Sequence, residues 1–286
     1  MKVGVMFANV VSFATPGGAK ALAAAAENAG VESLWTVEHV VVPEGYASPY
    51  PYSPTGKMPG DERAPIPDPL AWLSYMAALT TNVRLATGIL ILPQRNPVVL
   101  AKECATIDVL SGGRLTLGIG IGWLKEEFDA IGIPFDERTR RTDEYVRALR
   151  ALWSVDETHD GEFASFANAR SYPKPVQDGG IPIVVGGHTK GAARRAGRLG
   201  DGFFPARAEN LSDLLDEMRR AAKDAGRDPD AIEVTTGGPP SVDFAKQLAD
   251  QGVTRIVMPP PSFAPDDIGR ALGELSESFI SKVSSL

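Results

Sequence analysis

The sequence predicts an α/β fold, the (β/α)8 or TIM barrel, with an inserted loop after strand two and an excursion before strand five. Short apolar segments of strand length alternate with helical patterns along the chain of 286 residues, and strict alternation favours a parallel sheet. Eight such units can be counted, which favours a closed barrel over a doubly wound open sheet. Barrels of about 250 residues form a single domain, so we expect one domain over residues 1–286.

The first half of the chain contains four predicted strands, which alternate with helical patterns. The strands are expected at 3–7, at 32–37, from Arg84 through the apolar run around Gly88, and at 114–119. The helices are expected at 19–29, 68–80, 96–110, 124–131 and 136–153. Two of them begin with an N-cap residue followed by proline, at Asp68-Pro69 and Asn96-Pro97, which is a local start signal.

The second half continues the alternation after two long connections. The loop at 43–69 is rich in Pro, Tyr, Ser and Gly, and the loop at 156–180 contains an aromatic alternation at 162–166 that predicts a hairpin. Loops of this length inside a compact domain are usually functional. The remaining strands are expected at 181–185, 202–204, 232–236 and 255–258, and the helices at 190–199, 210–225, 242–251 and 265–282.

Composition narrows the class of partner. The net charge is −7, and nucleic acid or an anionic membrane surface would call for a basic patch. No apolar run reaches the roughly 18 residues that span a membrane, and the N-terminus has no signal-peptide pattern. The single cysteine, Cys104, fits a reducing compartment. We therefore expect a cytoplasmic protein that binds neither nucleic acid nor membranes.

Four unusual features follow predicted strands. They are Glu38-His39, the Gly88 region, the segment 118–123 and the segment 186–189. In a parallel barrel the chemistry lies at the C-terminal ends of the strands, so these features are expected to converge on one mouth. The three histidines, His39, His159 and His188, show no ligand spacing, so no metal site is predicted.

Each feature allows a functional and a structural interpretation. Gly88 either marks a bulge where a flat ring lies against the backbone or is a glycine in a core strand. His39 either donates and accepts a proton or is a structural histidine bonded to the long loop. The glycines at 118–122 either leave room for a ring or form a tight turn. The segment 186–189 either binds phosphate through free N–H groups or caps the next helix.

These pieces together resemble the luciferase-like monooxygenase superfamily, and more narrowly its branch that uses the deazaflavin coenzyme F420. The resemblance spans about residues 1–205. It rests on the segments LWTVEH at 34–39, DP at 68–69, LATGIL at 85–90, RNP at 95–97, GGRL at 112–115, GIGIGW at 118–123, EEF at 126–128, 138–145, PIVVGG at 182–187 and GDG at 200–202.

The resemblance implies a set of site residues. The cofactor ring would lie over the bulge in strand three, with a cis peptide at Gly88-Ile89, and the phosphate near the helix after strand five. A sugar-phosphate dehydrogenase of the family carries an acidic glutamate where this chain has Trp123, so that activity is not carried over, and Glu38 replaces a common aspartate. Together with the strand-end positions and the long loop, the resemblance gives these candidate residues: His39 and Glu38 as catalytic, Trp123, Tyr46 and Tyr50 as substrate-binding, and Thr87, Gly88, Ile89, Gly120, Ile121, Gly122, Gly186, Gly187, His188 and Thr189 as cofactor-binding.

The leading functional hypothesis is an oxidoreductase that transfers hydride between coenzyme F420 and a small organic substrate. The loop at 43–69, with Tyr46, Tyr50 and Tyr52, would cover that substrate. One alternative keeps the fold and uses reduced FMN with oxygen, as a monooxygenase. A second alternative is a non-catalytic barrel that binds a flavin-like ligand. The resemblance also implies a homodimer and a separate F420 or flavin reductase that supplies the reduced cofactor.

Overall fold

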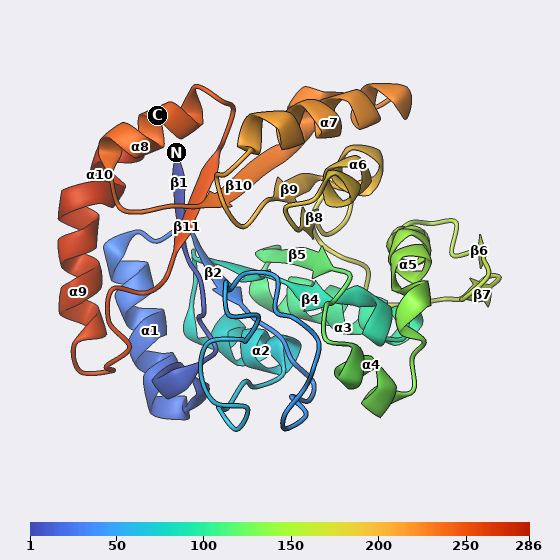
Figure 1. The fold of residues 1–286 in the computed structure, drawn as a ribbon, viewed down its shortest axis with the longest axis horizontal. Helices are drawn as coiled ribbons and strands as arrows, with labels where there is room; N and C mark the ends of the chain where they lie inside the picture. Colours follow the sequence, from blue (N-terminus) through green and yellow to red (C-terminus); the bar gives the residue numbers. More distant parts are fainter.

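The computed structural model describes all residues from 1 to 286. It contains a closed barrel of eight parallel strands, with helices on its outside (Figure 1). The predicted fold is therefore confirmed. The barrel strands are β1 (Lys2–Val5), β2 (Ser33–Thr36), β3 (Arg84–Thr87) with its continuation β4 (Leu90–Ile91), β5 (Leu115–Gly120), β8 (Ile183–Gly186), β9 (Gly202–Phe204), β10 (Glu233–Gly237) and β11 (Arg255–Met258).

Strand order around the barrel follows the chain. The ring closes on one side where β1 pairs with β11, with Lys2 opposite Arg255. β3 also pairs with β5, with Leu85 opposite Leu115, so no gap is left in the ring. All barrel pairings are parallel, so the C-terminal ends of the strands lie at one end of the barrel.

The helices lie near the predicted positions. They are α1 (Pro16–Ala29), α2 (Pro69–Leu79), α3 (Pro97–Ser111), α4 (Lys125–Ile131), α5 (Arg138–Trp153), α6 (Lys190–Leu199), α7 (Leu211–Asp224), α8 (Val242–Ala249), α9 (Ile268–Leu275) and α10 (Ser281–Val283), with a π-helical turn at Ser276–Ile280 between the last two. The first helix begins three residues earlier than predicted. The Thr15 hydroxyl accepts the Gly18 N–H at 3.2 Å, and Pro16 is the first helical residue.

The third strand is interrupted at the predicted glycine. The peptide bond Gly88–Ile89 is cis, as the resemblance implies, and it separates β3 from β4. The Gly88 N–H donates to the Thr36 carbonyl at 2.7 Å, which holds the break against β2. The predicted bulge is therefore present, and it falls near the C-terminal end of the barrel.

The interior of the barrel is filled around one tryptophan. Trp35 on β2 is fully buried and packs edge-on against Phe204, with 5.3 Å between ring centroids. Ala86, Val184 and Val257 complete this cluster from three other strands. A Cβ at Gly88 would lie 3.0 Å from Trp35, so the small residue at 88 also makes room for the indole.

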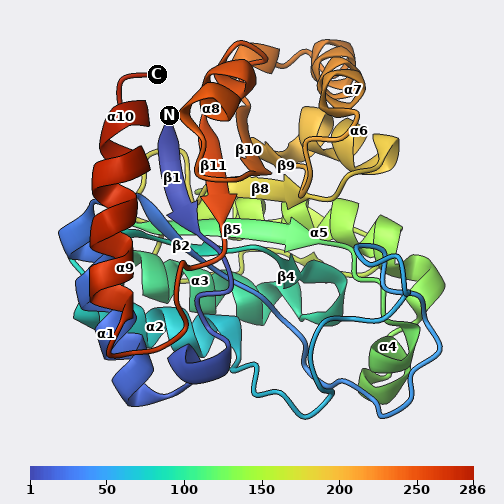
Figure 2. The ribbon, with the colours of Figure 1, turned by 60° about the vertical axis from the view of Figure 1, so that its left-hand side comes forward.

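Two excursions leave the barrel. The connection from β2 to α2 contains no helix or strand, and we call its residues 43–69 the lid. It lies beside α4 on the side toward which β5 and β8 point (Figure 2). The second excursion contains the antiparallel hairpin of β6 (His159–Asp160) and β7 (Ser165–Phe166), which projects beside α5 (Figure 1). The predicted hairpin is thus confirmed, with its first strand a few residues earlier.

Glu27, near the end of α1, fastens the segment that leads into β3. One carboxylate oxygen accepts the N–H groups of Thr81, Asn82 and Val83, and the other accepts the Asn82 side chain at 2.9 Å. Burial alone would raise the pKa of Glu27, but these hydrogen bonds hold it at about 2. Because the folded pKa lies below the unfolded one, this stabilisation is complete above about pH 4.5 and is lost as the pH falls toward 2.

We expect Glu27→Gln to lower the free energy of unfolding at pH 7 by about 1 kcal/mol. The difference from the parent protein should shrink between about pH 4.5 and pH 2, since the parent then loses its carboxylate. Urea unfolding at several pH values measures both effects. Glu277→Gln is the control, because the Glu277 side chain makes no hydrogen bond or ion pair. A difference of constant size down to pH 2 would contradict this account.

Candidate functional site

The four predicted segments meet at the C-terminal end of the barrel. Glu38-His39 follow β2, Gly88-Ile89 follow β3, Trp123 follows β5, and His188 follows β8. Contacts join them across the barrel end: the ring of His39 packs against Trp123, and the Ile89 side chain reaches both β5 and β8. The predicted convergence is therefore present in the structure.

His39 is held by a residue that the sequence analysis left without a role. Its Nδ1 lies 3.1 Å from the Glu127 carboxylate on α4, and its ring meets Trp123 edge-on at 5.7 Å. A carboxylate can only accept in this contact, so the Nδ1 of His39 carries a hydrogen. Nε2 makes no hydrogen bond within the chain. It is therefore the nitrogen available to accept a proton, or to donate one when the ring is charged.

Glu127 also binds the backbone that follows His39. Its other oxygen accepts the N–H of Val40 at 2.5 Å and that of Val41 at 3.3 Å. The residue is fully buried. The segment at 126–128 contributes to the family resemblance, but nothing local to it indicates a partner, because His39 lies 88 positions away along the chain.

Glu38 is engaged on both carboxylate oxygens. One accepts the Ile91 N–H and the other the Arg95 guanidinium, which also contacts Asp68 at 2.6 Å. Burial raises the pKa of Glu38, while the charge of Arg95 opposes that rise. These contacts describe an anchor that ties β2 to β4 and to the start of α2. The catalytic role of Glu38 stays a prediction.

The glycines at the ends of β5 and β8 both lie against the Ile89 side chain. A Cβ at Gly120 or at Gly186 would lie 2.5 Å from atoms of the Ile89 side chain. A side chain at either position would collide with Ile89, and the cofactor-binding role of these glycines stays a prediction. Gly122 has a φ of 79°, which is the turn conformation that suits glycine. The tight-turn interpretation thus applies to Gly122. Ile121, which lies between Gly120 and Gly122, is half-buried.

Thr87 faces the barrel wall. Its side chain is fully buried, and its hydroxyl donates to the Gly118 carbonyl at 2.6 Å. That hydrogen bond uses the single hydroxyl hydrogen. The threonine therefore closes the gap between β3 and β5, and its predicted contact with a cofactor would involve the backbone.

The turn after β8 combines a helix cap with an unpaired nitrogen. Thr189 caps α6 by accepting the Ala192 N–H at 3.2 Å, as in the structural interpretation. Gly187 has a φ of 122°, and its N–H donates to the Phe204 carbonyl. His188 differs, because its Nδ1 is buried and has no hydrogen-bond partner. Burial, aided by the charge of Arg207, lowers the pKa of His188.

Lid aromatics lie across the barrel end. Tyr46 and Tyr50 pack against Trp123 at ring distances of 5.5 Å and 5.1 Å, and Tyr52 packs against His188 at 4.8 Å. Tyr46 is buried, and its hydroxyl accepts the Met58 N–H, so it forms part of the lid's own core. Together these rings form a row between the ends of β5 and β8.

Two charged side chains hold the lid in this position. Glu126 on α4 accepts the N–H groups of Ala47 at 2.7 Å and Ser48 at 3.1 Å. Hydrogen bonds from Ser48 and from these backbone groups hold the pKa of Glu126 at about 2. Arg207, after β9, donates to the Tyr52 carbonyl. Sequence reasoning missed both residues, because each acts on a segment far away in the chain.

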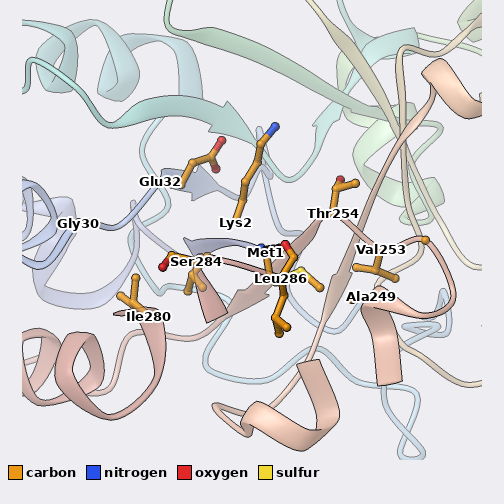
Figure 3. A pocket seen from close by; sticks show the side chains of 12 residues that line it. Met1, Lys2, Gly30, Glu32, Ala249, Val253, Thr254, Ile280, Ser284 and Leu286 are labelled. Carbon is orange, nitrogen blue, oxygen red and sulfur yellow. Dashed lines mark hydrogen bonds between the residues drawn. The ribbon is translucent and has the colours of Figure 1, made fainter. Parts of the chain in front are cut away.

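A hollow lies at the opposite end of the barrel from the candidate site. It is a cavity of about 580 Å³ bordered by the start of β1, the segment before β2 and the C-terminal residues (Figure 3). The Met1 ammonium donates to the Val283 carbonyl there at 2.9 Å. Residues at the N-terminal end of such barrels serve stability, so we place the site at the other end.

Three further findings concern predicted features. Cys104 is fully buried in α3, and burial raises the pKa of its thiol far above the ordinary value, as expected of a cysteine that packs as a small hydrophobe. None of the helices has the length and apolar character needed to cross a membrane. No three His, Cys, Asp or Glu side chains are grouped so that they could hold a metal ion.

A parallel eight-stranded barrel with an oriented histidine and an aromatic lid at its C-terminal end belongs to the class of barrel enzymes. The chain matches the luciferase-like monooxygenase family model over residues 1–272. It belongs to the luciferase-like monooxygenase family.

Relatives and solved structures agree with this placement. An uncharacterized protein of Mycobacterium tuberculosis is 34% identical over 242 residues, 83% of each chain. The F420-dependent glucose-6-phosphate dehydrogenase of Kineococcus radiotolerans is 32% identical over 229 residues, 77% of this chain and 62% of that one. The FMNH2-dependent dimethylsulfone monooxygenase of Pseudomonas putida is 35% identical over 153 residues, which are 51% of this chain and 42% of that one. The monooxygenase RslO1 of Streptomyces bottropensis superposes with a TM-score of 0.75 at 25% identity, over 98% and 99% of the two chains.

Proposed function

We propose that this protein is an oxidoreductase that transfers hydride between coenzyme F420 and a small organic substrate. The observation that carries the proposal is the orientation of His39, whose Nδ1 is held by Glu127 while Nε2 has no partner in the chain. The match to an F420-dependent relative, which covers 77% of this chain against 51% for the FMN-dependent one, supports the deazaflavin.

The residues at the barrel end fit such a cofactor. His188 presents a buried nitrogen without a partner, and burial of an unpaired polar atom is costly unless a ligand or water satisfies it. With the turn at 187–189 and the start of α6, it would hold a phosphate or another polar group. The backbone at Gly88-Ile89 and at 121–122 would support the ring. When bound, the deazaflavin supplies or accepts two electrons as hydride.

The chain's own residues would manage the proton and the solvent. When hydride adds to the carbon of a carbonyl-type substrate, one proton must reach the carbonyl oxygen, and protonated His39 would donate it from Nε2. In the reverse direction neutral His39 would accept that proton at Nε2. Trp123 and the lid tyrosines would exclude water and surround an apolar part of the substrate.

The alternative is an FMN-dependent monooxygenase on the same barrel. The match to the Pseudomonas putida enzyme and the similarity to RslO1 favour it. The two functions differ in their use of oxygen. A flavin monooxygenase consumes one O2 per turnover, whereas hydride transfer with a deazaflavin consumes none.

A side-by-side titration tests the proposal. Absorbance and mass spectrometry of the protein after exposure to F420 and to FMN should show tighter binding of F420. Reduced F420 should then be oxidised by an accepted substrate without oxygen consumption. Preferential binding of FMN with oxygen uptake would replace the proposal by the alternative. Tight binding of either ligand with no turnover of any reductant would indicate a non-catalytic barrel.

We also propose a homodimer, with reduced cofactor supplied by a separate reductase. Large apolar side chains are exposed on α3 at Val98, Val99, Val109 and Leu110, and Tyr75 is exposed on α2. Exposed apolar side chains on neighbouring helices favour association. Light scattering at micromolar concentration should give twice the mass of 30.4 kDa. A mass that stays at one chain would contradict the dimer.

A further inference from the structure

We infer that Glu127 is a positioning residue that couples the seating of the lid to the protonation form of His39. The inference deepens the proposed function, because it concerns the histidine that would move the proton. It rests on one buried carboxylate that binds both the imidazole and the backbone leading into the lid.

The contacts of Glu127 form a closed unit. One carboxylate oxygen accepts a hydrogen bond from the Nδ1–H of His39, and the other accepts the backbone N–H groups of Val40 and Val41. These are three consecutive residues, and one residue separates them from the lid. Displacement of 40–41 would therefore withdraw donors from the same carboxylate that orients the ring.

Packing of the adjacent residue fixes the position of Glu127 on α4. Its neighbour Phe128 is fully buried and packs against Phe135 with 5.2 Å between centroids. A fully buried carboxylate requires hydrogen-bond donors to offset its loss of water. The N–H groups of His39, Val40 and Val41 are the donors present, so the segment and the carboxylate hold each other in place.

The charge of Glu127 selects the tautomer of His39. Since a carboxylate only accepts, neutral His39 keeps its hydrogen on Nδ1 and its lone pair on Nε2. A glutamine in this position has one accepting oxygen for two backbone N–H donors, and its NH2 group would face Nδ1. The neutral ring is then expected to move its hydrogen to Nε2, which removes the accepting lone pair from the open side.

Glu126 provides a matched control on the same helix turn. It also binds lid N–H groups, at Ala47 and Ser48, but it makes no contact with His39. Glu126→Gln keeps an accepting oxygen but loses the negative charge that strengthens these two hydrogen bonds, so it should loosen the lid without touching the imidazole. Glu127→Gln is expected to change both the lid and the imidazole.

Histidine 15N NMR on the cofactor-free protein reads the tautomer directly. The chain has three histidines, so a His39→Gln variant assigns the signals. We expect the Nδ1–H form in the parent protein, the Nε2–H form in Glu127→Gln, and the Nδ1–H form in Glu126→Gln. Glu127→Asp keeps an accepting carboxylate and should show the Nδ1–H form of the parent protein. If the glutamine variant does not fold, the tautomer in Glu127→Asp still tests the inference.

Limited proteolysis and turnover test the coupling. Both glutamine variants should be cleaved faster within the lid than the parent protein, because neutral glutamine accepts these backbone N–H groups more weakly than a carboxylate does. With F420 and substrate, Glu127→Gln should lose about 10²-fold in kcat, within the range of a positioned acid-base group, with a smaller change in KM. The inference is overturned if Glu127→Gln keeps the Nδ1–H form, if Glu127→Asp fails to restore it, or if lid cleavage in Glu127→Gln equals that of the parent.

These readouts separate the inference from the proposed function. The NMR and proteolysis measurements need no cofactor. A parent protein that fails to turn over F420 would refute the proposed function, while the tautomer and the lid would still decide the role of Glu127.

Discussion

Replacement of His39 by alanine should lower kcat with F420 by about 10²–10⁴-fold, the contribution expected of a positioned acid-base group. At the barrel end, the imidazole of His39 has Nδ1 held by Glu127, while its Nε2 has no partner in the chain. Cofactor affinity should change little, because the substitution leaves the Gly88-Ile89 bulge and His188 in place. Stopped-flow absorbance of F420 measures the rate, and an equilibrium titration measures the affinity.

His188→Ala is the control for this prediction. His188 has an unpaired buried Nδ1 at the start of α6, where we place a polar group of the cofactor. Its loss should weaken F420 binding and leave kcat at saturating cofactor close to that of the parent. If His39→Ala retains full turnover, or if the two variants show the reverse pattern, the assigned roles are wrong.

Gly118→Ala should destabilise the barrel by at least about 3 kcal/mol, at the upper end of the range for overpacked sites. A Cβ at this position would lie 1.8 Å from the Thr87 carbonyl oxygen. The obstacle is backbone, so no rotamer change can relieve it. Either β3 and β5 separate or the barrel deforms, and the Thr87–Gly118 hydrogen bond is lost. Chemical denaturation measures the change.

Gly273→Ala is the matched control in α9. No atom lies within 4 Å of a Cβ at Gly273, and alanine in a helix interior stabilises by roughly 0.5–1 kcal/mol relative to glycine. The two variants should therefore shift the denaturation midpoint in opposite directions. A Gly118→Ala protein as stable as the parent would mean that β3 and β5 are farther apart than the structure describes.

Elements with local signals could be predicted from the sequence. Asp68-Pro69 and Asn96-Pro97 correctly mark the starts of α2 and α3, since both side chains cap the next N–H groups. The same signal at Thr15-Pro16 was present and was missed, which is why α1 begins earlier than expected. The first strand is shorter than predicted, because Phe7 adopts a positive φ that the apolar pattern does not reveal.

The convergence of the candidate site residues could be predicted, but the contacts that join them could not. Strand ends placed His39, Gly88 and His188 at one mouth. The partner of His39 stayed hidden because Glu127 lies on a different unit of the barrel. The reason for Gly120 and Gly186 stayed hidden because Ile89 fills their space from a third strand.

The sequence by itself determined the order of strands and helices, the break at Gly88 and the end of the barrel where the site lies. These features depend on spacing along the chain, which caps, apolar periodicity and glycines encode locally. Only the tertiary structure decided that Glu127 orients His39, that Glu38 binds Arg95, and that lid aromatics cross the barrel end. Those contacts join residues from separate βα units, and closure of the ring is what brings them within hydrogen-bonding distance.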